Sequence, residues 1–224
     1  MRFVALVGGV FMFFLADRAF GGEGAARIGW RQEFGSMPSD WKLRGKPGTP
    51  NAVFTVGRSS DGSNTWLNMS ADKASASLVV ELPGVKLKDT PILRWAWRVT
   101  VFPEGADGRE SAKDDQAIGV YVSTGGMFSQ QSLAYRWETE TPIGAEGTAS
   151  YAGGVVKVKW ICLRNKTSVQ GETFLVEERN VAEDFKSRFG SVPDKIGLSI
   201  SCNSQYTGSK AEAQLAWIEF VSAP

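Results

Sequence analysis

The sequence predicts an all-β protein in which two packed antiparallel sheets form a sandwich, with one short helix. Stretches in which apolar and polar residues alternate with period two recur from residue 28 to residue 221. Most of these stretches are separated by clusters of Gly, Pro, Asp, Asn or Ser, such as residues 57–64 and 144–154. A single helical segment over residues 181–189 interrupts them, with Gly190 at its end and Pro193 beyond.

About eleven strands are expected. They run over residues 28–34, 52–56, 65–70, 77–82, 92–101, 116–123, 132–139, 155–163, 174–180, 195–202 and 214–221. Short strands in this number bury their apolar faces best as two layers. Because neither a repeat of fixed period nor a linker divides the chain, residues 22–224 are expected to form one domain.

The first residues predict export. Arg2 gives a positive start, residues 3–16 are mainly apolar, and small residues precede Gly22, which is the layout of a secretory signal over residues 1–21. The alternative, a membrane anchor, needs about 20 apolar residues. We therefore expect a periplasmic or secreted protein with no membrane span after the signal is removed.

Composition excludes several classes of function. The chain beyond residue 21 has 23 basic and 23 acidic residues, a balance that argues against a nucleic-acid partner. The absence of histidine excludes a Ser-His-Asp triad, a Cys-His pair and any His-ligated metal. Cys162 and Cys202 are the only cysteines, and they form either a disulfide or two separate buried thiols.

Alternation divides the central strands into two faces. One face is apolar and is expected to fill the sandwich: Leu93, Trp95, Trp97, Val99, Ile118, Val120, Val122, Leu133, Tyr135 and Trp137. If the three strands are neighbours, the opposite face collects Arg94, Arg98, Tyr121, Arg136 and Glu138. Such a face suits a polyhydroxylated or acidic ligand, because arginine matches carboxylates with a rigid fork of donors. The alternative is a solvated face with cross-strand Arg–Glu pairs.

Several carboxylates are candidates for chemistry. Asp115 precedes a strand, where it would line the edge of a binding groove or brace a loop. Glu138 and Glu140 are two residues apart and so lie about 6–7 Å apart on a strand, a spacing that a glycosidase pair permits. Solvated charges at a strand end are the alternative. If the protein is an enzyme, its candidate catalytic residues are Glu138, Asp115 and Tyr121.

A family resemblance rests on an ordered set of motifs. These are residues 91–99 (PILRWAWRV), 113–115 (KDD), 120–122 (VYV), 134–137 (AYRW), 177–181 (EERNV), 184–185 (DF) and 189–190 (FG). In this order they resemble the bacterial exported proteins grouped as domain of unknown function 3047. The resemblance implies a jelly-roll sandwich similar to galactose-binding and concanavalin-like modules, and it implies no activity.

Two further expectations depend on this resemblance. Family members often have Asp-Thr-Asp-Asn-Thr-Gly after the penultimate strand, whereas residues 203–208 read Asn-Ser-Gln-Tyr-Thr-Gly here, so a metal or acid role of those aspartates is doubtful in this chain. In galactose-binding-like sandwiches, acidic residues of the terminal strands commonly meet at a structural Ca²⁺ site, for which Glu33 and Glu219 are the candidates here. No other cofactor is indicated.

Three functional hypotheses remain. The favoured one is a non-catalytic binding module for a carbohydrate or another polar or acidic ligand, which uses Arg94, Arg98, Asp115, Tyr121, Arg136 and Glu138. The first alternative is a carbohydrate-active enzyme, either a carboxylate-based glycosidase or a polysaccharide lyase that uses Tyr121 and Arg136. The second alternative is a structural or protein-interaction sandwich.

Overall fold

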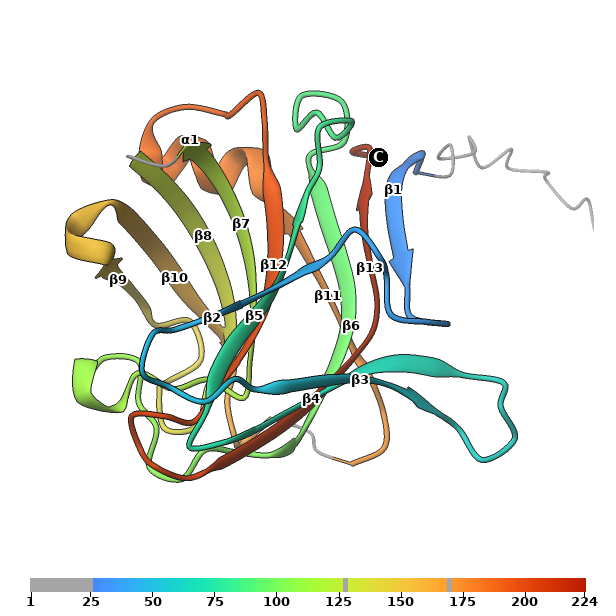
Figure 1. Ribbon diagram of the computed structural model, residues 1–224. Helices are drawn as coiled ribbons and strands as arrows, with labels where there is room; N and C mark the ends of the chain where they lie inside the picture. The colour runs from blue at the N-terminus through green and yellow to red at the C-terminus, as the bar shows by residue number, and fades with distance from the viewer. Residues whose placement is uncertain (1–25, 127–128, 169–170) are drawn as a thin grey trace, which may run out of the picture.

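The computed structural model describes residues 26–126, 129–168 and 171–224, so the expected signal over residues 1–21 lies outside the described part. Two β-sheets face each other, and one short helix, α1, lies at one end of the sandwich (Figure 1). The predicted all-β, two-sheet fold is therefore confirmed. Within the described residues, no helix is both long and apolar enough to cross a membrane.

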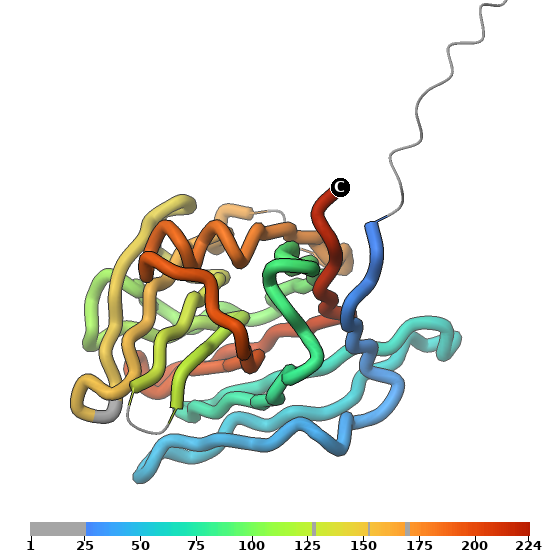
Figure 2. Tube along the Cα trace, turned by 90° about the horizontal axis from the view of Figure 1, so that it is seen from above, coloured from blue at the N-terminus to red at the C-terminus, as the bar shows by residue number. Residues whose placement is uncertain are grey.

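Sheet A has six strands in the order β11-β6-β13-β4-β3, and β1 also pairs with β13. Its strands are β1 (Ile28–Glu33), β3 (Val53–Arg58), β4 (Thr65–Asp72), β6 (Ile92–Val101), β11 (Leu175–Asn180) and β13 (Lys210–Val221). All their pairings are antiparallel. Because β1 pairs with β13, the two ends of the described chain run side by side, as Figure 2 also shows.

Sheet B has seven strands in the order β2-β5-β12-β7-β8-β10-β9. These strands are β2 (Lys42–Gly45), β5 (Ser75–Glu81), β7 (Ile118–Gly126), β8 (Ser129–Trp137), β9 (Glu146–Tyr151), β10 (Val156–Arg164) and β12 (Gly197–Asn203). One pair differs from the antiparallel expectation: β10 lies between β8 and β9 and runs parallel to β8. The sheet is thus largely antiparallel.

Two strands of sheet B escaped the sequence prediction. All four residues of β2 are exposed, so nothing forces its side chains to alternate between apolar and polar. Strand β9 reads Glu-Gly-Thr-Ala-Ser-Tyr and has little apolar content. Both are edge strands, which pair on one side only. Their hydrogen bonds to a neighbour, rather than a buried face, define them as strands.

The core between the sheets has the aromatic content that alternation predicts. Trp95 and Trp97 of β6 are fully buried, and their rings contact side chains of sheet B across the sandwich. Trp95 stacks on Tyr135 with ring centroids 5.5 Å apart, and Trp97 packs on Trp137 at the same separation. Each such side chain contributes roughly 2–3 kcal/mol by leaving water, so these contacts fix how the sheets face each other.

Helix α1 (Val181–Phe189) matches its predicted bounds because both of its ends are capped. The side chain of Asn180 accepts a hydrogen bond from the Glu183 N–H at 3.2 Å, and Gly190 ends the helix with a φ of 86°. The helix is tied to the sandwich by the Tyr135 hydroxyl, which donates to Asp184 Oδ2 at 2.8 Å.

Candidate functional site

The charged residues assigned to one face lie on two different faces. Strand β6 belongs to sheet A, whereas β7 and β8 belong to sheet B. Arg94 and Arg98 therefore project from the outer face of sheet A, while Tyr121, Arg136 and Glu138 project from the outer face of sheet B. The expected single arginine-bearing face is wrong, because the three strands are not neighbours. Alternation correctly predicted which side chains point away from the core.

A cleft of about 610 Å³ crosses the outer face of sheet B. Twelve of its eighteen lining residues have a hydroxyl or amide side chain, and two are charged. The lining residues are Gly45, Lys46, Pro47, Ser75, Ser77, Asp114, Tyr121, Ser123, Gln130, Ser132, Tyr151, Val156, Val158, Ser199, Ser201, Asn203, Gln205 and Tyr206. We call this the sheet B cleft.

The serines of the cleft floor follow from strand periodicity and register. Four of the six occupy alternate positions of β5 and β12, so they face outward while the residues between them enter the core, and the other two lie on β7 and β8. Ser77 pairs in register with Ser201, and Ser123 with Ser132, whose hydroxyls are 2.7 Å apart. Adjacent strands thus bring the serines together on one face, where Ser132 and Ser201 are buried and the other four are partly exposed.

Three of the four tyrosines of the chain line the cleft. Tyr121 lies half-buried on the floor, and the missing side chain of Gly119 makes room for it, since a Cβ there would lie 2.6 Å from the Tyr121 ring. Tyr151 and Tyr206 are 38% and 39% exposed. The ammonium group of Lys46 lies 4.4 Å from the centroid of the Tyr206 ring and bonds its hydroxyl at 3.0 Å. The cleft therefore offers aromatic surface together with hydroxyls.

A buried arginine lies next to this floor. Arg136 is 0% exposed, and its Nη1 donates to Asp114 Oδ1 at 2.8 Å and to Glu138 Oε1 at 3.5 Å. The guanidinium carbon lies 5.2 Å from the centroid of the Trp160 ring. Its Nε and Nη2 have no hydrogen-bond partner among the described residues. Arg136 is thus the cation of an internal network and not the solvated cross-strand partner that a sheet face would normally carry.

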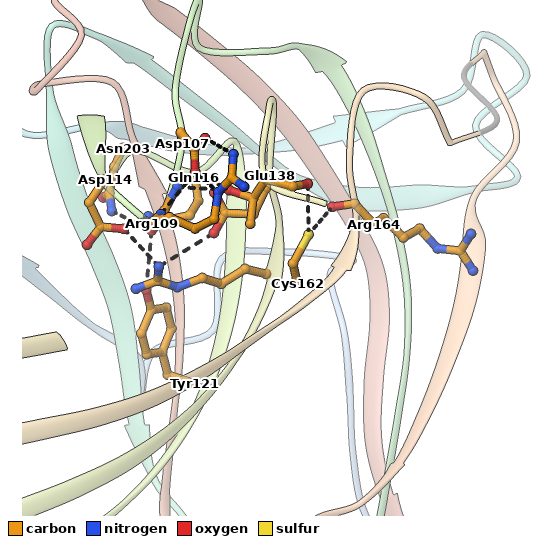
Figure 3. Close-up of polar contacts among 12 residues, drawn as sticks. Asp107, Arg109, Asp114, Gln116, Tyr121, Glu138, Cys162, Arg164 and Asn203 are labelled. Atoms are coloured by element: carbon orange, nitrogen blue, oxygen red, sulfur yellow. Dashed lines mark hydrogen bonds and ion pairs between the residues drawn. The ribbon is translucent and has the colours of Figure 1, made fainter. Parts of the chain in front are cut away.

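Asp114 connects this arginine to the cleft surface. Its carboxylate also accepts hydrogen bonds from Gln116 Nε2 at 2.8 Å and from the Tyr151 hydroxyl at 3.1 Å. The Gln116 carbonyl oxygen in turn accepts from the Tyr121 hydroxyl at 3.3 Å and from Asn203 Nδ2 at 3.2 Å. Figure 3 shows Asp114, Gln116, Tyr121 and Asn203 gathered in this network. The network fixes the positions of two of the three cleft tyrosines.

Glu138 is fully buried and does not line the cleft. The Thr141 hydroxyl donates to Glu138 Oε2 at 3.3 Å, and the backbone of Gly108 packs so closely that a Cβ there would lie 2.8 Å from Oε1. Burial raises the pKa of Glu138 from 4.5 to about 7. Glu140, its neighbour at i+2, is exposed and paired with Lys166 at 2.5 Å, so the two carboxyls do not form a pair.

Asp115 braces a loop, which was one of its two predicted roles. Its Oδ2 accepts hydrogen bonds from the Thr207 backbone N–H at 2.8 Å and from the Thr207 hydroxyl at 2.9 Å. The side chain is fully buried and lies outside the cleft lining. Asp115 thereby holds the segment that carries Gln205 and Tyr206 at the cleft.

The two calcium candidates are bridged by an arginine. Arg31 contacts Glu33 at 2.9 Å and Glu219 at 2.6 Å, because Arg31 pairs in register with Glu219 on the neighbouring strand. No group of three or more potential metal ligands occurs within the described ranges. The guanidinium of Arg31 thus pairs with both carboxylates.

Both cysteines are free and buried, so the disulfide alternative is wrong. Cys202 lies in β12 and Cys162 in β10, and strands β7 and β8 separate them. At about 4.8 Å per strand the two backbones are too far apart for a bond that needs Cα atoms within about 7 Å. The two residues pack as small apolar side chains.

A second hollow, of about 870 Å³, crosses the outer face of sheet A. Its lining residues are Glu33, Arg58, Ser59, Ser60, Ser63, Asn64, Thr65, Trp66, Ala96, Arg98, Glu172, Phe174, Val176, Ala216 and Trp217. We call it the sheet A groove. Of the predicted ligand-binding arginines, Arg98 lines it, whereas Arg94 lies outside it and is paired with Glu178 and Glu219.

Sequence reasoning missed most of the cleft. Its serines and the rim tyrosines Tyr151 and Tyr206 were not singled out as candidates. One signal could have found the serines, because Ser75 and Ser77 alternate with core residues, as do Ser199 and Ser201. The rim tyrosines gave no such signal, since they lie at a strand end and in a loop.

Comparisons with known proteins concern the family and the arrangement of strands. The family described as "Protein of unknown function (DUF3047)" matches residues 40–219. No curated protein matches the chain in sequence.

Several solved structures are similar in fold. A thermostable cellulase derived from Cel12A of Rhodothermus marinus is 12% identical, with a TM-score of 0.45 over 81% of this chain and 96% of that one. A family 11 carbohydrate-binding module from Clostridium thermocellum, in complex with a mixed-linked tetrasaccharide, is 9% identical, with a TM-score of 0.44 over 86% and 94%. The xylan-binding module CBM15 is 10% identical, with a TM-score of 0.42 over 87% and 97%.

Proposed function

From the premise that this chain belongs to the DUF3047 family, whose function is unknown, we propose that it is an exported, non-catalytic module that binds a neutral carbohydrate in the sheet B cleft. One observation carries the proposal: six serines, three tyrosines and three amide side chains line a single cleft. Hydroxyls and amides donate and accept hydrogen bonds, as sugar hydroxyls do. Tyrosine rings add apolar surface with a polar tip.

The charge of the cleft favours a neutral ligand. Among its lining residues only Lys46 and Asp114 are charged, and both already have partners within the protein. Lys46 is the one cation of the lining, and it lies at the exposed rim against the hydroxyl and ring of Tyr206, whereas the floor itself carries no cation. The guanidinium of Arg136, which lies next to the floor, is fully buried and is paired with Asp114 and Glu138.

Binding is favoured over catalysis by the state of the candidate catalytic residues. Glu138 and Asp115 are buried outside the cleft lining, so neither carboxyl would reach a glycosidic bond in the cleft. Burial raises the pKa of the Tyr121 hydroxyl, which works against its use as the base of an elimination. These features support a binding module over a glycosidase or lyase.

Calorimetric titration of the protein that lacks residues 1–21 with soluble neutral polysaccharides, chosen from a glycan array, tests the proposal. We expect saturable binding that Tyr206→Ala and Tyr151→Ala each weaken at least about fivefold, because stacking surface is lost. Trp66→Ala, on the opposite sheet, is the matched control and should leave this affinity unchanged. The absence of any neutral glycan ligand would instead favour a structural sandwich.

Two further assays test the remaining parts of the proposal. Reducing-sugar release from the bound neutral polymers should stay at background. Absorbance at 235 nm should also stay at background with polygalacturonate, because an elimination needs a uronate ring, and activity in either assay would support an enzyme. Export is tested by N-terminal sequencing of the full chain expressed in a bacterial host. The proposal expects a periplasmic or secreted product that begins at Gly22.

A further inference from the structure

We propose that the sheet A groove is a second binding site, which takes a carboxylate-bearing oligosaccharide such as an oligouronate. The groove and the cleft lie on the outer faces of different sheets, so the two sites would be occupied independently. This inference does not depend on the function proposed for the cleft.

The shape of the groove suits a flat, ring-containing ligand. Its floor includes the small side chains Ala96 and Ala216, which leave space above the sheet. Trp66 and Phe174 pack against each other with ring centroids 5.9 Å apart, and Trp217 contributes a third aromatic side chain. A guanidinium already lies over each ring, since Arg98 covers Trp66 and Phe174 at 5.4 and 4.6 Å from their centroids and Arg31 covers Trp217 at 4.7 Å. A pyranose ring would pack against the ring surface that stays exposed beside the small-residue floor.

The two arginines of the groove, Arg98 and Arg58, are hydrogen-bonded to neutral acceptors. Arg98 Nε donates to the Gln214 side chain and Nη1 to the Glu172 backbone carbonyl, while its guanidinium lies 4.6 Å from the centroid of the Phe174 ring. Arg58 Nη2 donates to the Gly35 carbonyl at 2.7 Å. In the described part of the chain, neither guanidinium has a carboxylate oxygen within ion-pair distance. Both are therefore available to an anionic group of a ligand.

Arg94 lies on the same strand and face as Arg98 but outside the groove, and its partners are carboxylates. It lies four residues before Arg98 and contacts Glu178 at 3.4 Å and Glu219 at 3.6 Å. Arg98 instead has neutral hydrogen-bond acceptors and aromatic rings around it. These neutral partners orient the guanidinium without neutralising its charge.

The negative charges near the groove limit the ligand to one with spaced carboxylates. Glu33 is paired with Arg31, and Asp61 in the adjoining hairpin turn accepts hydrogen bonds from Ser59 and Ser63. Glu172 is the other carboxylate of the lining. Because these acids lie close by, a dense polyanion would be repelled, whereas a sugar with one carboxylate per ring could place it at Arg98.

The test is calorimetric titration with trigalacturonate and with its fully methyl-esterified form, using the chain without residues 1–21. The ester keeps the rings and removes the charge. We expect the acid to bind at least about tenfold more tightly than the ester, the loss typical of one charge-assisted hydrogen bond. Arg98→Gln and Arg58→Gln should each reduce the affinity for the acid, and Arg94→Gln, the matched control, should not.

Several results would overturn the inference. They are equal affinity for acid and ester, unchanged affinity in Arg98→Gln, and equally tight binding of a hexa-aspartate peptide, which would indicate an acidic protein ligand. Loss of trigalacturonate binding in Tyr206→Ala would move the ligand to the cleft. Conversely, failure of neutral glycans to bind the cleft leaves the expectation for trigalacturonate unchanged, so the two proposals fail separately.

Discussion

The sheet B cleft and the sheet A groove lie on the outer faces of the two sheets, and they use arginine in opposite ways. Next to the cleft floor, Arg136 is buried with Asp114 and Glu138, and the cleft lining is rich in neutral hydroxyl side chains. In the groove, Arg98 lies partly exposed without a carboxylate partner among the described residues. The cause lies in the covering segments, since the loop at Gly108 packs directly on Glu138. An outward-facing position thus does not by itself make an arginine available to a ligand.

The largest expected effect is a difference in stability between two variants, Arg136→Met and Arg98→Met. Arg136→Met leaves Asp114 and Glu138 buried without their cation, so we expect a loss of about 3–5 kcal/mol in the free energy of unfolding. Arg98→Met should cost less than about 1 kcal/mol, because no ion pair is lost and its position is partly exposed. Urea denaturation of both variants measures the difference, and equal losses would mean that the two arginines do not differ in the way described.

The pH dependence of the free energy of unfolding should reveal the titration of Glu138, the buried carboxyl beside the cleft. The folded pKa of Glu138 is about 7 against 4.5 normally, so between these pH values the folded state holds a proton that the unfolded state has lost. Stability should therefore fall as pH rises from about 4.5 to about 7, by up to about 1.4 kcal/mol per pH unit from this group.

Glu138→Gln tests this assignment. The variant should lose that part of the pH slope when free energies of unfolding are compared at pH 5 and pH 7.5. Glu172→Gln, which changes a carboxyl of the groove, is the control and should keep the slope of the parent protein. Parallel slopes in the parent protein and Glu138→Gln would rule out Glu138 as the titrating group.

A smaller effect is expected from filling the space beneath Tyr121. In Gly119→Ala the new Cβ would meet the Tyr121 ring at 2.6 Å, which should cost about 1–3 kcal/mol of stability and weaken ligand binding in the cleft. Binding in the groove should not change. Gly84→Ala, where no atom lies within 4 Å of the new Cβ, serves as control for the substitution itself. Unchanged cleft affinity in Gly119→Ala would show that the position of Tyr121 is irrelevant to binding.

The smallest expected effect is that of a reductant. Burial raises the pKa of Cys162 to about 12 and also raises that of Cys202, so neither thiol should react with a thiol reagent at pH 8 in the folded protein. Both should react in denaturant without prior reduction, and dithiothreitol should leave the Tm unchanged. A requirement for reduction before either thiol reacts would indicate a disulfide.

Prediction from sequence succeeded where a local signal existed. The strand that contains Trp95 and Trp97 was predicted with its bounds and its buried face, because alternation there is strict. Helix α1 was predicted because Gly190, a residue that commonly ends helices, follows its last residue. Strands β2 and β9 failed because edge strands with exposed side chains show no apolar periodicity.

The candidate site was predicted only in part. Tyr121 was named and lines the cleft, and Arg98 was named and lines the groove. Arg136, Glu138 and Asp115 were named as ligand-binding residues, yet the structure buries all three. Burial by a loop distant in sequence cannot be deduced from a strand pattern, because the covering residues contribute nothing to that pattern.

The sequence by itself determined which side chains of each strand enter the core and which leave it, because successive side chains of a strand point to opposite faces. Only the tertiary structure decided which strands are neighbours, and hence that Arg98 and Tyr121 lie on different sheets. Strand order depends on pairing between segments far apart in the chain. The register of those pairings depends on the strand order, and it places six serines and three tyrosines in one cleft.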